Sequence, residues 1–258
     1  MAKKREILNR RKFLFNSAYF LVGSLFGLNS FSKAFALEEH RIALIIDDIG
    51  YSLCRAREFL ELGVPITFAI LPRLAKSHDL ALEIDGKGHE IMLHQPMEPY
   101  NSSLDPGPGA LYVGYGTRRI FRIVEENVSS IPFAIGVNNH MGSRLTSSRK
   151  EMNDVLRVIK KRRLFFVDSL TSSRSMAYRT AKRLHITSGC RNIFLDNRPD
   201  ESAILTQLHK LKRHALKYKC AIGIGHPFPE TARAIGRFQR GLKDSSVSLV
   251  HVSRILHS

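Results

Sequence analysis

The chain has 258 residues, 43% of them hydrophobic, and a formal net charge of +17. This length and apolar content suffice for one well-packed domain, and α/β barrels commonly fill such a length as a single unit. The absence of internal repeats and low-complexity tracts excludes repeat and low-complexity proteins. The three cysteines form no C-x-x-C pair, so a cysteine zinc site or redox motif is not expected. Cys54, Cys190 and Cys220 could supply one disulfide in an oxidising compartment, or three buried free thiols.

The first 36 residues have the layout of an export signal. A basic start is followed by a largely apolar stretch from Phe13 to Phe31, and Ala34-Phe35-Ala36 offers the small residues at which a signal peptidase cleaves. Arg10-Arg11 fits the twin-arginine pattern. We therefore expect a twin-arginine signal peptide at residues 1–36 and a single periplasmic domain at residues 37–258, with an uncleaved membrane anchor as the alternative.

The charge remains strongly basic without that segment. Residues 1–36 contain seven Lys or Arg and one Glu, and so leave +11 of the +17 for the rest of the chain. Nucleic acid is one class of partner for such a charge, and anionic envelope polymers or membrane surfaces are another. Because the signal directs export, we expect an anionic envelope glycan and no nucleic acid, with membrane contact only through the signal before its cleavage.

Short apolar, β-branched runs alternate with segments of helical spacing along the rest of the chain. The expected strands are Ile42–Ile46, Ile66–Ile70, Glu90–Leu93, Phe133–Val137, Leu164–Val167, Ile193–Leu195, Ala221–Ile224 and Val247–Val252. The expected helices are Leu53–Leu62, Lys76–Lys87, Arg118–Ser129, Arg149–Arg162, Ser175–Leu184, Glu201–Lys219 and Glu230–Leu242. The alternation is typical of an α/β fold with parallel strands covered by helices. Seven or eight such units favour a (β/α) barrel over the alternative of an open sheet.

Polar side chains follow six of these strands. In chain order they are Asp47-Asp48, His94, Asn138-Asn139-His140, Asp168-Ser169, Asp196-Asn197 and His226. In a parallel barrel the carboxyl ends of the strands meet at one face, where the active site lies. Asp, Asn and Ser also begin helices as N-caps, and this interpretation suits Ser169 and either Asp196 or Asn197. It does not suit three histidines and a double aspartate.

A metal site explains the aspartates and histidines together. A divalent ion such as zinc takes carboxylate and imidazole ligands, and a catalytic zinc site keeps one position open for water. A cation also allows two adjacent carboxylates to stay ionised. Because neighbouring residues at a strand end project in different directions, one aspartate can bind the metal while the other faces the water.

Six motifs of the chain resemble those of the divergent polysaccharide deacetylases, relatives of the NodB-homology polysaccharide deacetylases. They are IIDDIGYS (45–52), LHQPMEP (93–99), GVNNHMGSRLT (136–146), FVDSLT (166–171), IFLDN (193–197) and IGIGHPFPET (222–231), and they lie within residues 41–252. The resemblance implies a distorted (β/α) barrel of seven to eight parallel strands, a divalent metal that is usually zinc, and hydrolysis of N-acetyl groups on a sugar polymer.

The resemblance also assigns roles to individual residues. Asp47 takes the place of the catalytic base, Asp48 that of the metal-binding aspartate, His94 that of the first metal-binding histidine, and His226 that of the catalytic acid. Deacetylases of this kind carry a second metal histidine four residues after the first, where this chain has Glu98. Either Glu98 or His140 supplies the third ligand, and we favour His140.

The remaining polar residues of the motifs are expected in supporting roles. Glu98 would orient a ligand or Arg144, and Asp168 or Asp196 would hold His226 in one tautomer, while Asn139 is a further supporting residue or alternative ligand. The sequence thus predicts a metal-dependent carbohydrate deacetylase acting on a peptidoglycan-like envelope glycan. The chain has no Trp, and the usual arginine motif is not evident. The alternative is therefore a glycan-binding or envelope-organising protein that keeps the barrel and the metal without turnover.

Overall fold

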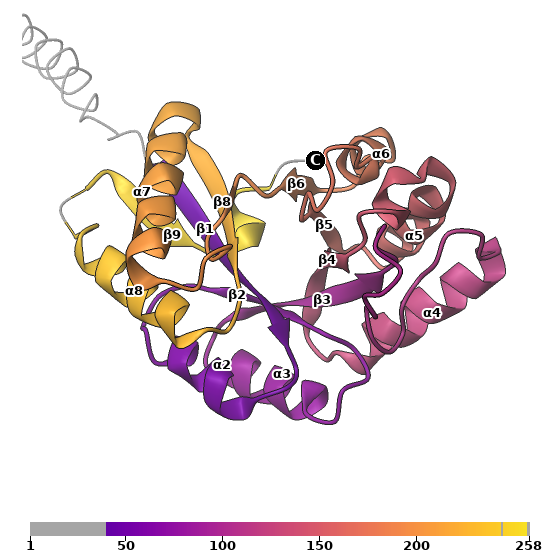
Figure 1. The fold of residues 1–258 in the computed structure, drawn as a ribbon, viewed down its shortest axis with the longest axis horizontal. Coiled ribbons are helices and arrows are strands. Elements are labelled where there is room, and N and C mark those ends of the chain that lie inside the picture. Colours follow the sequence, from indigo (N-terminus) through magenta and orange to yellow (C-terminus); the bar gives the residue numbers. More distant parts are fainter. Residues whose placement is uncertain (1–39, 244, 257–258) are drawn as a thin grey trace, which may run out of the picture. The chain divides into compact units, whose positions relative to one another are not determined.

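The computed structural model describes residues 40–243 and 245–256, so the predicted export signal lies outside the described residues. In the described part, parallel strands form a curled sheet whose outer face carries the helices (Figure 1). The strands are β1 (His40–Ile49), β2 (Thr67–Ile70), β3 (Glu90–Met97), β4 (Ala134–Met141), β5 (Phe165–Asp168), β6 (Ser188–Cys190), β7 (Ile193–Phe194), β8 (Cys220–Gly225) and β9 (Val247–Val250).

In the described residues, seven α-helices connect these strands. They are α2 (Leu53–Leu60), α3 (Ser77–Gly86), α4 (Thr117–Ser130), α5 (Arg149–Lys161), α6 (Ala177–Arg183), α7 (Glu201–Tyr218) and α8 (Pro229–Arg240). Two begin with the side-chain caps that favour helix starts: Ser52 accepts from the Arg55 amide, and Asp200 accepts from the Ala203 amide. Each of the seven overlaps a helix expected from the spacing of apolar residues.

The strand order is β6-β5-β4-β3-β2-β1-β8-β7, and all the recorded pairings are parallel. Within the described residues, no pairing joins β6 to β7, so the ring of strands is incomplete. β1 pairs with β8 on one side, and with β9 and then β2 on the other. The expected distorted barrel of seven to eight parallel strands is therefore confirmed, with an opening between β6 and β7.

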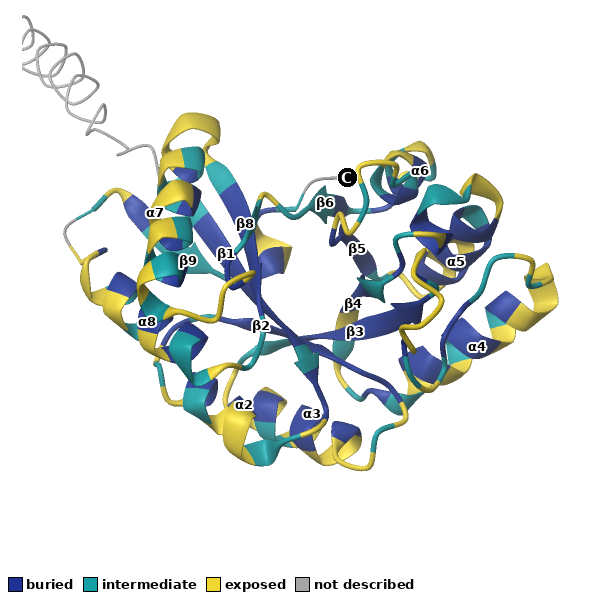
Figure 2. Ribbon diagram, in the orientation of Figure 1, coloured by how far each residue is buried: buried dark blue, intermediate teal, exposed yellow. Residues whose placement is uncertain are grey.

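Two apolar layers hold the sheet in place. Alternate residues of β1 face opposite sides: Ile42, Leu44 and Ile46 pack in the cluster shared with the helices, and Ala43 and Ile45 pack in the cluster on the other face of the sheet. All five are fully buried. Burial of such a side chain contributes about 1.5–3 kcal/mol for the larger aliphatic residues. Figure 2 shows the result: β1, β2, β3, β5 and β8 are largely buried, β7 and most of β9 are partly exposed, and the outward sides of the helices are exposed.

Several strands run further than the sequence pattern predicts. β1 continues through Ile49, β3 through Met97 and β4 through Met141. Asp47, Asp48, His94 and the 138–140 segment therefore lie inside strands, where the expectation placed them just after strand ends. The pattern ended these strands at a polar residue, yet Asp47, His94 and Asn138 are accommodated within strands because they form hydrogen bonds with one another across strands.

One strand was not predicted. β6 consists of Ser188, Gly189 and Cys190, which carry no β-branched side chain, and it pairs only with β5. The segment expected as the sixth strand is β7, and the segment expected as the seventh is β8. The three cysteines are free, and Cys54 is exposed where buried thiols were one expectation. Among the described residues, none of the helices has the length and apolar character needed to cross a bilayer.

Candidate metal and acid–base site

The two adjacent aspartates of β1 point into one site because the strand is irregular there. The register of β1 against β2 shifts between Ile46 and Ile49, and Asp48 adopts a left-handed backbone with φ of 57°. A regular strand would send neighbouring side chains to opposite faces, whereas a bulge redirects one of them. The irregularity thus brings both carboxylates together, which differs from the divergent directions expected from a regular strand.

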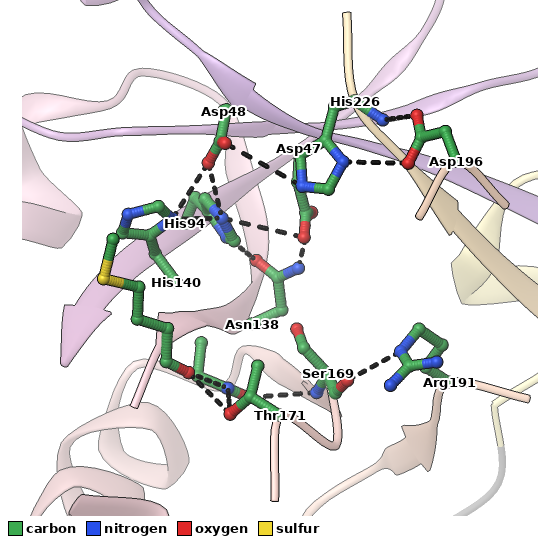
Figure 3. Close-up of polar contacts among 12 residues, drawn as sticks. Asp47, Asp48, His94, Asn138, His140, Ser169, Thr171, Arg191, Asp196 and His226 are labelled. Atoms are coloured by element: carbon green, nitrogen blue, oxygen red, sulfur yellow. Dashed lines mark hydrogen bonds and ion pairs between the residues drawn. The ribbon is translucent and has the colours of Figure 1, made fainter. Parts of the chain in front are cut away.

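Two histidines, from β3 and β4, converge on Asp48 of β1 (Figure 3). The Asp48 Oδ1 atom lies 3.1 Å from His94 Nε2 and 2.9 Å from His140 Nδ1, and these two nitrogens are 3.1 Å apart. The register of β3 against β4 explains the histidines: His94 pairs with Asn138, and His140 follows two residues later on the same face. The structure brings together the three residues favoured as metal ligands.

Asn138 joins this cluster to Asp47. Its Nδ2 donates to Asp47 Oδ1 at 2.8 Å, and its Oδ1 accepts from His94 Nδ1 at 2.7 Å. Asn138 is fully buried, and His94 and Asp47 are almost so, at 2% and 3% exposed. Asn139 and His140 were predicted site residues, whereas the sequence assigned no role to Asn138. The signal that could have found it is the period of two along a strand, because Asn138 and His140 share a face.

The donor set fits a divalent cation. With Nδ1 of His94 committed to Asn138, the Nε2 of a neutral His94 presents a lone pair to Asp48 Oδ1, which itself has no hydrogen bond of acceptable geometry. Lone pairs crowded at about 3 Å repel unless a positive charge lies among them. Zinc bonds of about 2.0–2.2 Å to nitrogen and oxygen place neighbouring ligand atoms at about this spacing. Carboxylate and imidazole are ligands of borderline ions such as zinc.

The electrostatics of the cluster favour positive charge at the same place. Burial opposes ionisation of Asp48, but the imidazoles of His140 and His94 outweigh it and hold the pKa of Asp48 well below its usual range. Burial likewise opposes the charged form of His94, yet the Asp47 and Asp48 carboxylates raise the pKa of His94. A cation bound by Asp48, His94 and His140 would take the place of this added proton.

Asp47 and His226 flank the cluster. The Asp47 Oδ2 atom lies 3.6 Å from His94 Nε2, and His226 Nε2 lies 3.8 Å from Asp48 Oδ2. β1 pairs with β8 up to Ile46 and Gly225, so Asp47 and His226 are the next residues along their two strands. Burial is the largest influence on Asp47 and raises the pKa of its carboxyl, with His94 and His226 acting in the opposite direction.

Asp196 fixes the orientation of His226. Its Oδ1 accepts from His226 Nδ1 at 2.9 Å, while its Oδ2 accepts from the His226 backbone amide at 2.6 Å and from Thr231 Oγ1 at 2.8 Å. This leaves His226 Nε2 directed toward Asp48 (Figure 3). Burial opposes protonation of His226, but the hydrogen bond and charge of Asp196 outweigh it and raise the pKa of His226 to about 9.

Four of the predicted supporting residues lie outside this cluster. Glu98 accepts from Arg144 at 3.0 Å and from the Val113 amide at 2.8 Å, so its carboxylate is engaged away from the histidines. Asn139 bonds the Met141 carbonyl and the Ser169 amide. Asp168 accepts from Leu170, Ser175 and Tyr178 and thereby holds the turn after β5. Of Asp168 and Asp196, only Asp196 contacts His226.

The helix-cap interpretation of Ser169 and Asp196 does not match the contacts. Ser169 is 2% exposed, its Oγ has no hydrogen-bond partner, and Figure 3 shows this hydroxyl pointing toward Asn138. The N-cap of α7 is Asp200, and Asp196 bonds His226 and Thr231 instead. Arg191, to which no role was assigned, donates to the Ser169 and Leu170 carbonyls beside the site.

Comparison with known proteins identifies relatives across nearly all of the described chain. Residues 44–256 match the family described as divergent polysaccharide deacetylase. The uncharacterized protein YibQ of Escherichia coli K12 is 31% identical over 217 residues, which span 84% of this chain and 67% of that protein.

Solved structures agree with this assignment of the fold. An uncharacterized protein from Agrobacterium tumefaciens C58, ATU2773, superposes with a TM-score of 0.80 at 26% identity, over 84% of this chain and 89% of that one. A CE4 family pseudoenzyme from Bacillus anthracis gives 0.53 at 13% identity, over 84% and 65% of the two chains. The catalytic domain of a peptidoglycan N-acetylglucosamine deacetylase from Eubacterium rectale gives 0.52 at 11% identity, over 83% and 89%. The last two show the fold alone.

Proposed function

The chain belongs to the divergent polysaccharide deacetylase family, and we propose that it is a zinc-dependent hydrolase that removes N-acetyl groups from a cell-envelope glycan. The observation that carries this proposal is that two side chains able to transfer protons flank one set of three candidate metal ligands. Asp47 and an Asp196-held His226 lie on either side of the convergent Asp48, His94 and His140. A site that only binds a glycan has no need of this arrangement.

Asp47 is the base in this proposal. Its Oδ1 is held by Asn138, while its Oδ2 faces His94 Nε2 at 3.6 Å. Oδ2 is therefore the atom that accepts the proton of the attacking water. Burial raises the pKa of Asp47 and makes the carboxylate a stronger proton acceptor. A divalent cation bound by Asp48, His94 and His140 would supply Lewis acidity toward the acetyl carbonyl and toward water.

His226 is the acid in this proposal. Asp196 accepts the Nδ1 proton of His226 and holds its ring, so Nε2 carries the proton that passes to the departing amine. A pKa of about 9 keeps the imidazole protonated at neutral pH. General acid and base steps of this kind contribute about 10²–10⁴-fold each to the rate.

Aromatic rings and positive charge support a glycan substrate. The rings of Phe194 and Phe228 lie 5.1 and 5.8 Å from the His226 ring, centroid to centroid, and Phe228 is 39% exposed. Apolar ring faces of this kind suit the faces of a sugar ring. The net charge of +11 on residues 37–258 favours an anionic polymer such as a peptidoglycan-like glycan. The twin-arginine pattern at residues 1–36 supports a periplasmic location, where such a polymer lies.

Acetate release tests this function directly. Zinc-loaded protein is incubated with N-acetylated glycans, and the variants Asp47→Asn and His226→Ala are assayed beside it with their zinc content measured. Glu125→Gln, which removes the surface ion pair of Glu125 with Arg162, serves as the control. We expect both site variants to retain zinc and lose activity. Full activity in both variants would show that these roles are wrong.

The second candidate function is binding of an envelope glycan without turnover. The absence of Trp and the fold shared with a CE4 family pseudoenzyme favour it. Glycan binding with bound zinc, but without acetate release from any N-acetylated envelope glycan, would support this function over the first.

A further inference from the structure

We propose that Asn138 is a positioning residue that couples the base to the metal-binding cluster, because one amide group sets both the orientation of Asp47 and the tautomer of His94. Asn138 lies on β4 between these two side chains, and both of its hydrogen bonds are short and buried. The part of this inference that concerns Asp47 rests on the proposed function. The part that concerns His94 depends only on Asp48, His94 and His140 as candidate metal ligands.

The orientation of the Asn138 amide follows from Asp47. An ionised carboxylate only accepts hydrogen bonds, so the group facing Asp47 Oδ1 at 2.8 Å must be the donating Nδ2. The Oδ1 of Asn138 then faces His94. Carbonyl and amide ends of an Asn are assigned from such a network, and here the carboxylate leaves a single choice.

The tautomer of His94 follows in turn. A carbonyl oxygen only accepts, so His94 Nδ1 must carry the proton of the 2.7 Å contact. In the neutral imidazole this leaves Nε2 unprotonated, and Nε2 is the nitrogen that lies 3.1 Å from Asp48 Oδ1 and 3.1 Å from His140 Nδ1. Asn138 therefore presents the lone pair of His94 to the place where the three ligand atoms converge. The same kind of partner commonly fixes the tautomer of a metal-ligating histidine.

The same amide also sets which oxygen of Asp47 is free. The Asn138 contact engages Oδ1, whereas Oδ2 faces the cluster 3.6 Å from His94 Nε2. Only an amide of this length meets both needs at once, since it has a donor for the carboxylate and an acceptor for the imidazole. An Asp at this position keeps the acceptor alone, and a Leu keeps neither.

Two substitutions of similar shape separate the two contacts. Asn138→Asp keeps an oxygen for His94 Nδ1–H but faces Asp47 with a second carboxylate, which repels it. We expect this variant to bind zinc within about threefold of the native affinity and to lose about 100-fold or more in kcat. Asn138→Leu removes both contacts, so zinc affinity is expected to fall about 10- to 100-fold.

Asn127→Leu is the matched control. Asn127 is equally buried and makes three hydrogen bonds, to Gln95, Gly109 and Arg73, but it contacts neither Asp47 nor His94. Zinc affinity is measured by competition with a chromophoric chelator on the full-length protein. The Nδ1 proton of His94 is followed by ¹⁵N NMR of the zinc-loaded protein. We expect this proton in the native protein, in Asn138→Asp and in Asn127→Leu, and its loss to exchange in Asn138→Leu.

A double variant in which residues 47 and 138 exchange side chains provides a test by Tm that depends neither on turnover nor on the stability of any single variant. Asp47→Asn with Asn138→Asp restores the hydrogen bond with donor and acceptor reversed, so its Tm is expected to exceed that predicted from the two single variants. Additive Tm changes, native zinc affinity in Asn138→Leu, or native kcat in Asn138→Asp would each overturn the proposal. If the native protein releases no acetate, the proposed function fails, and the zinc, NMR and Tm results still decide the role of Asn138.

Discussion

Replacing Asp196 by Asn removes the charge that keeps His226 protonated. Asp196 has no exposed side-chain surface and accepts three hydrogen bonds, two from His226 and one from Thr231. Burial of His226 lowers the pKa of its imidazole, but the hydrogen bond and charge of Asp196, together with the charges of Asp47 and Asp48, outweigh it and raise the pKa to about 9 from a usual value of 6.5. An amide carries no charge, so the pKa of His226 falls from about 9, while the Asp47 and Asp48 carboxylates still raise it against burial.

The upper limit of the effect follows from the pKa of the native protein. A rise in the pKa of His226 from 6.5 to about 9 corresponds to about 3 kcal/mol of preference for the protonated imidazole, to which Asp196 contributes most and Asp47 and Asp48 the rest. At about pH 7.5 a pKa of about 9 leaves about 97% of His226 protonated, and a return of the pKa all the way to 6.5 would leave about 9%. The proton donor is thus depleted by up to about tenfold, before any loss from misorientation of the ring.

The assay is an NMR titration of His226 in the metal-free protein, paired with a pH profile of kcat for the zinc-loaded protein. We expect the titration midpoint near pH 9 in the native protein and at a clearly lower pH in Asp196→Asn, with the alkaline fall in kcat moved in the same direction. Because the folded-state pKa is raised, His226 stabilises the native fold fully below about pH 6.5 and loses this contribution as the pH rises through about 9. An unchanged midpoint in Asp196→Asn would refute the reasoning.

Three further changes test other parts of the site. His140→Ala should lower zinc affinity, measured by chelator competition, about 100-fold or more. Glu98→Gln should leave zinc affinity unchanged, because Glu98 is engaged by Arg144 and Val113. An equal loss of zinc affinity in both variants would show that Glu98 is a ligand. Ser169→Ala should change the unfolding free energy, measured by urea denaturation, by less than about 0.5 kcal/mol, because the Ser169 hydroxyl has no hydrogen-bond partner. A loss of about 1 kcal/mol would instead indicate that Ser169 caps a helix. Zinc should raise Tm in differential scanning calorimetry by relieving the repulsion among Asp48, His94 and His140, and a chelator should reverse this rise. Asp48→Asn should abolish most of the rise in Tm. If zinc raised the Tm of Asp48→Asn as much as that of the native protein, zinc would bind elsewhere.

The sequence predicted the fold well because apolar periodicity and strand-end chemistry are local. The run Ile42–Ile46 indicates a buried strand from its β-branched residues alone, whereas its pairing with β2, β8 and β9 is known from the structure. The short strand at Ser188–Cys190 escaped prediction because tertiary pairing with β5, and no propensity of its own, makes it extended.

The site was predictable as a set of residues and unpredictable as a geometry. His94 and His140 were singled out because histidine is a poor helix cap, and Asp48 because the family resemblance assigns it to the metal; the structure brings these three together. The sequence did not predict the bulge at Asp48, because Asp adopts both extended and left-handed backbones and the pairing of β1 with β2 decides between them. Asn138 was passed over because an amide at a strand end has an ordinary interpretation until its two partners are known.

Acetate release by the zinc-loaded protein, measured beside Asp47→Asn with equal zinc content, tests the central claim most directly. The account predicts that the native protein releases acetate from an N-acetylated envelope glycan and that Asp47→Asn, with its zinc retained, is at least about 100-fold slower. Equal rates from the two proteins, or release that persists after the zinc is removed, would contradict it.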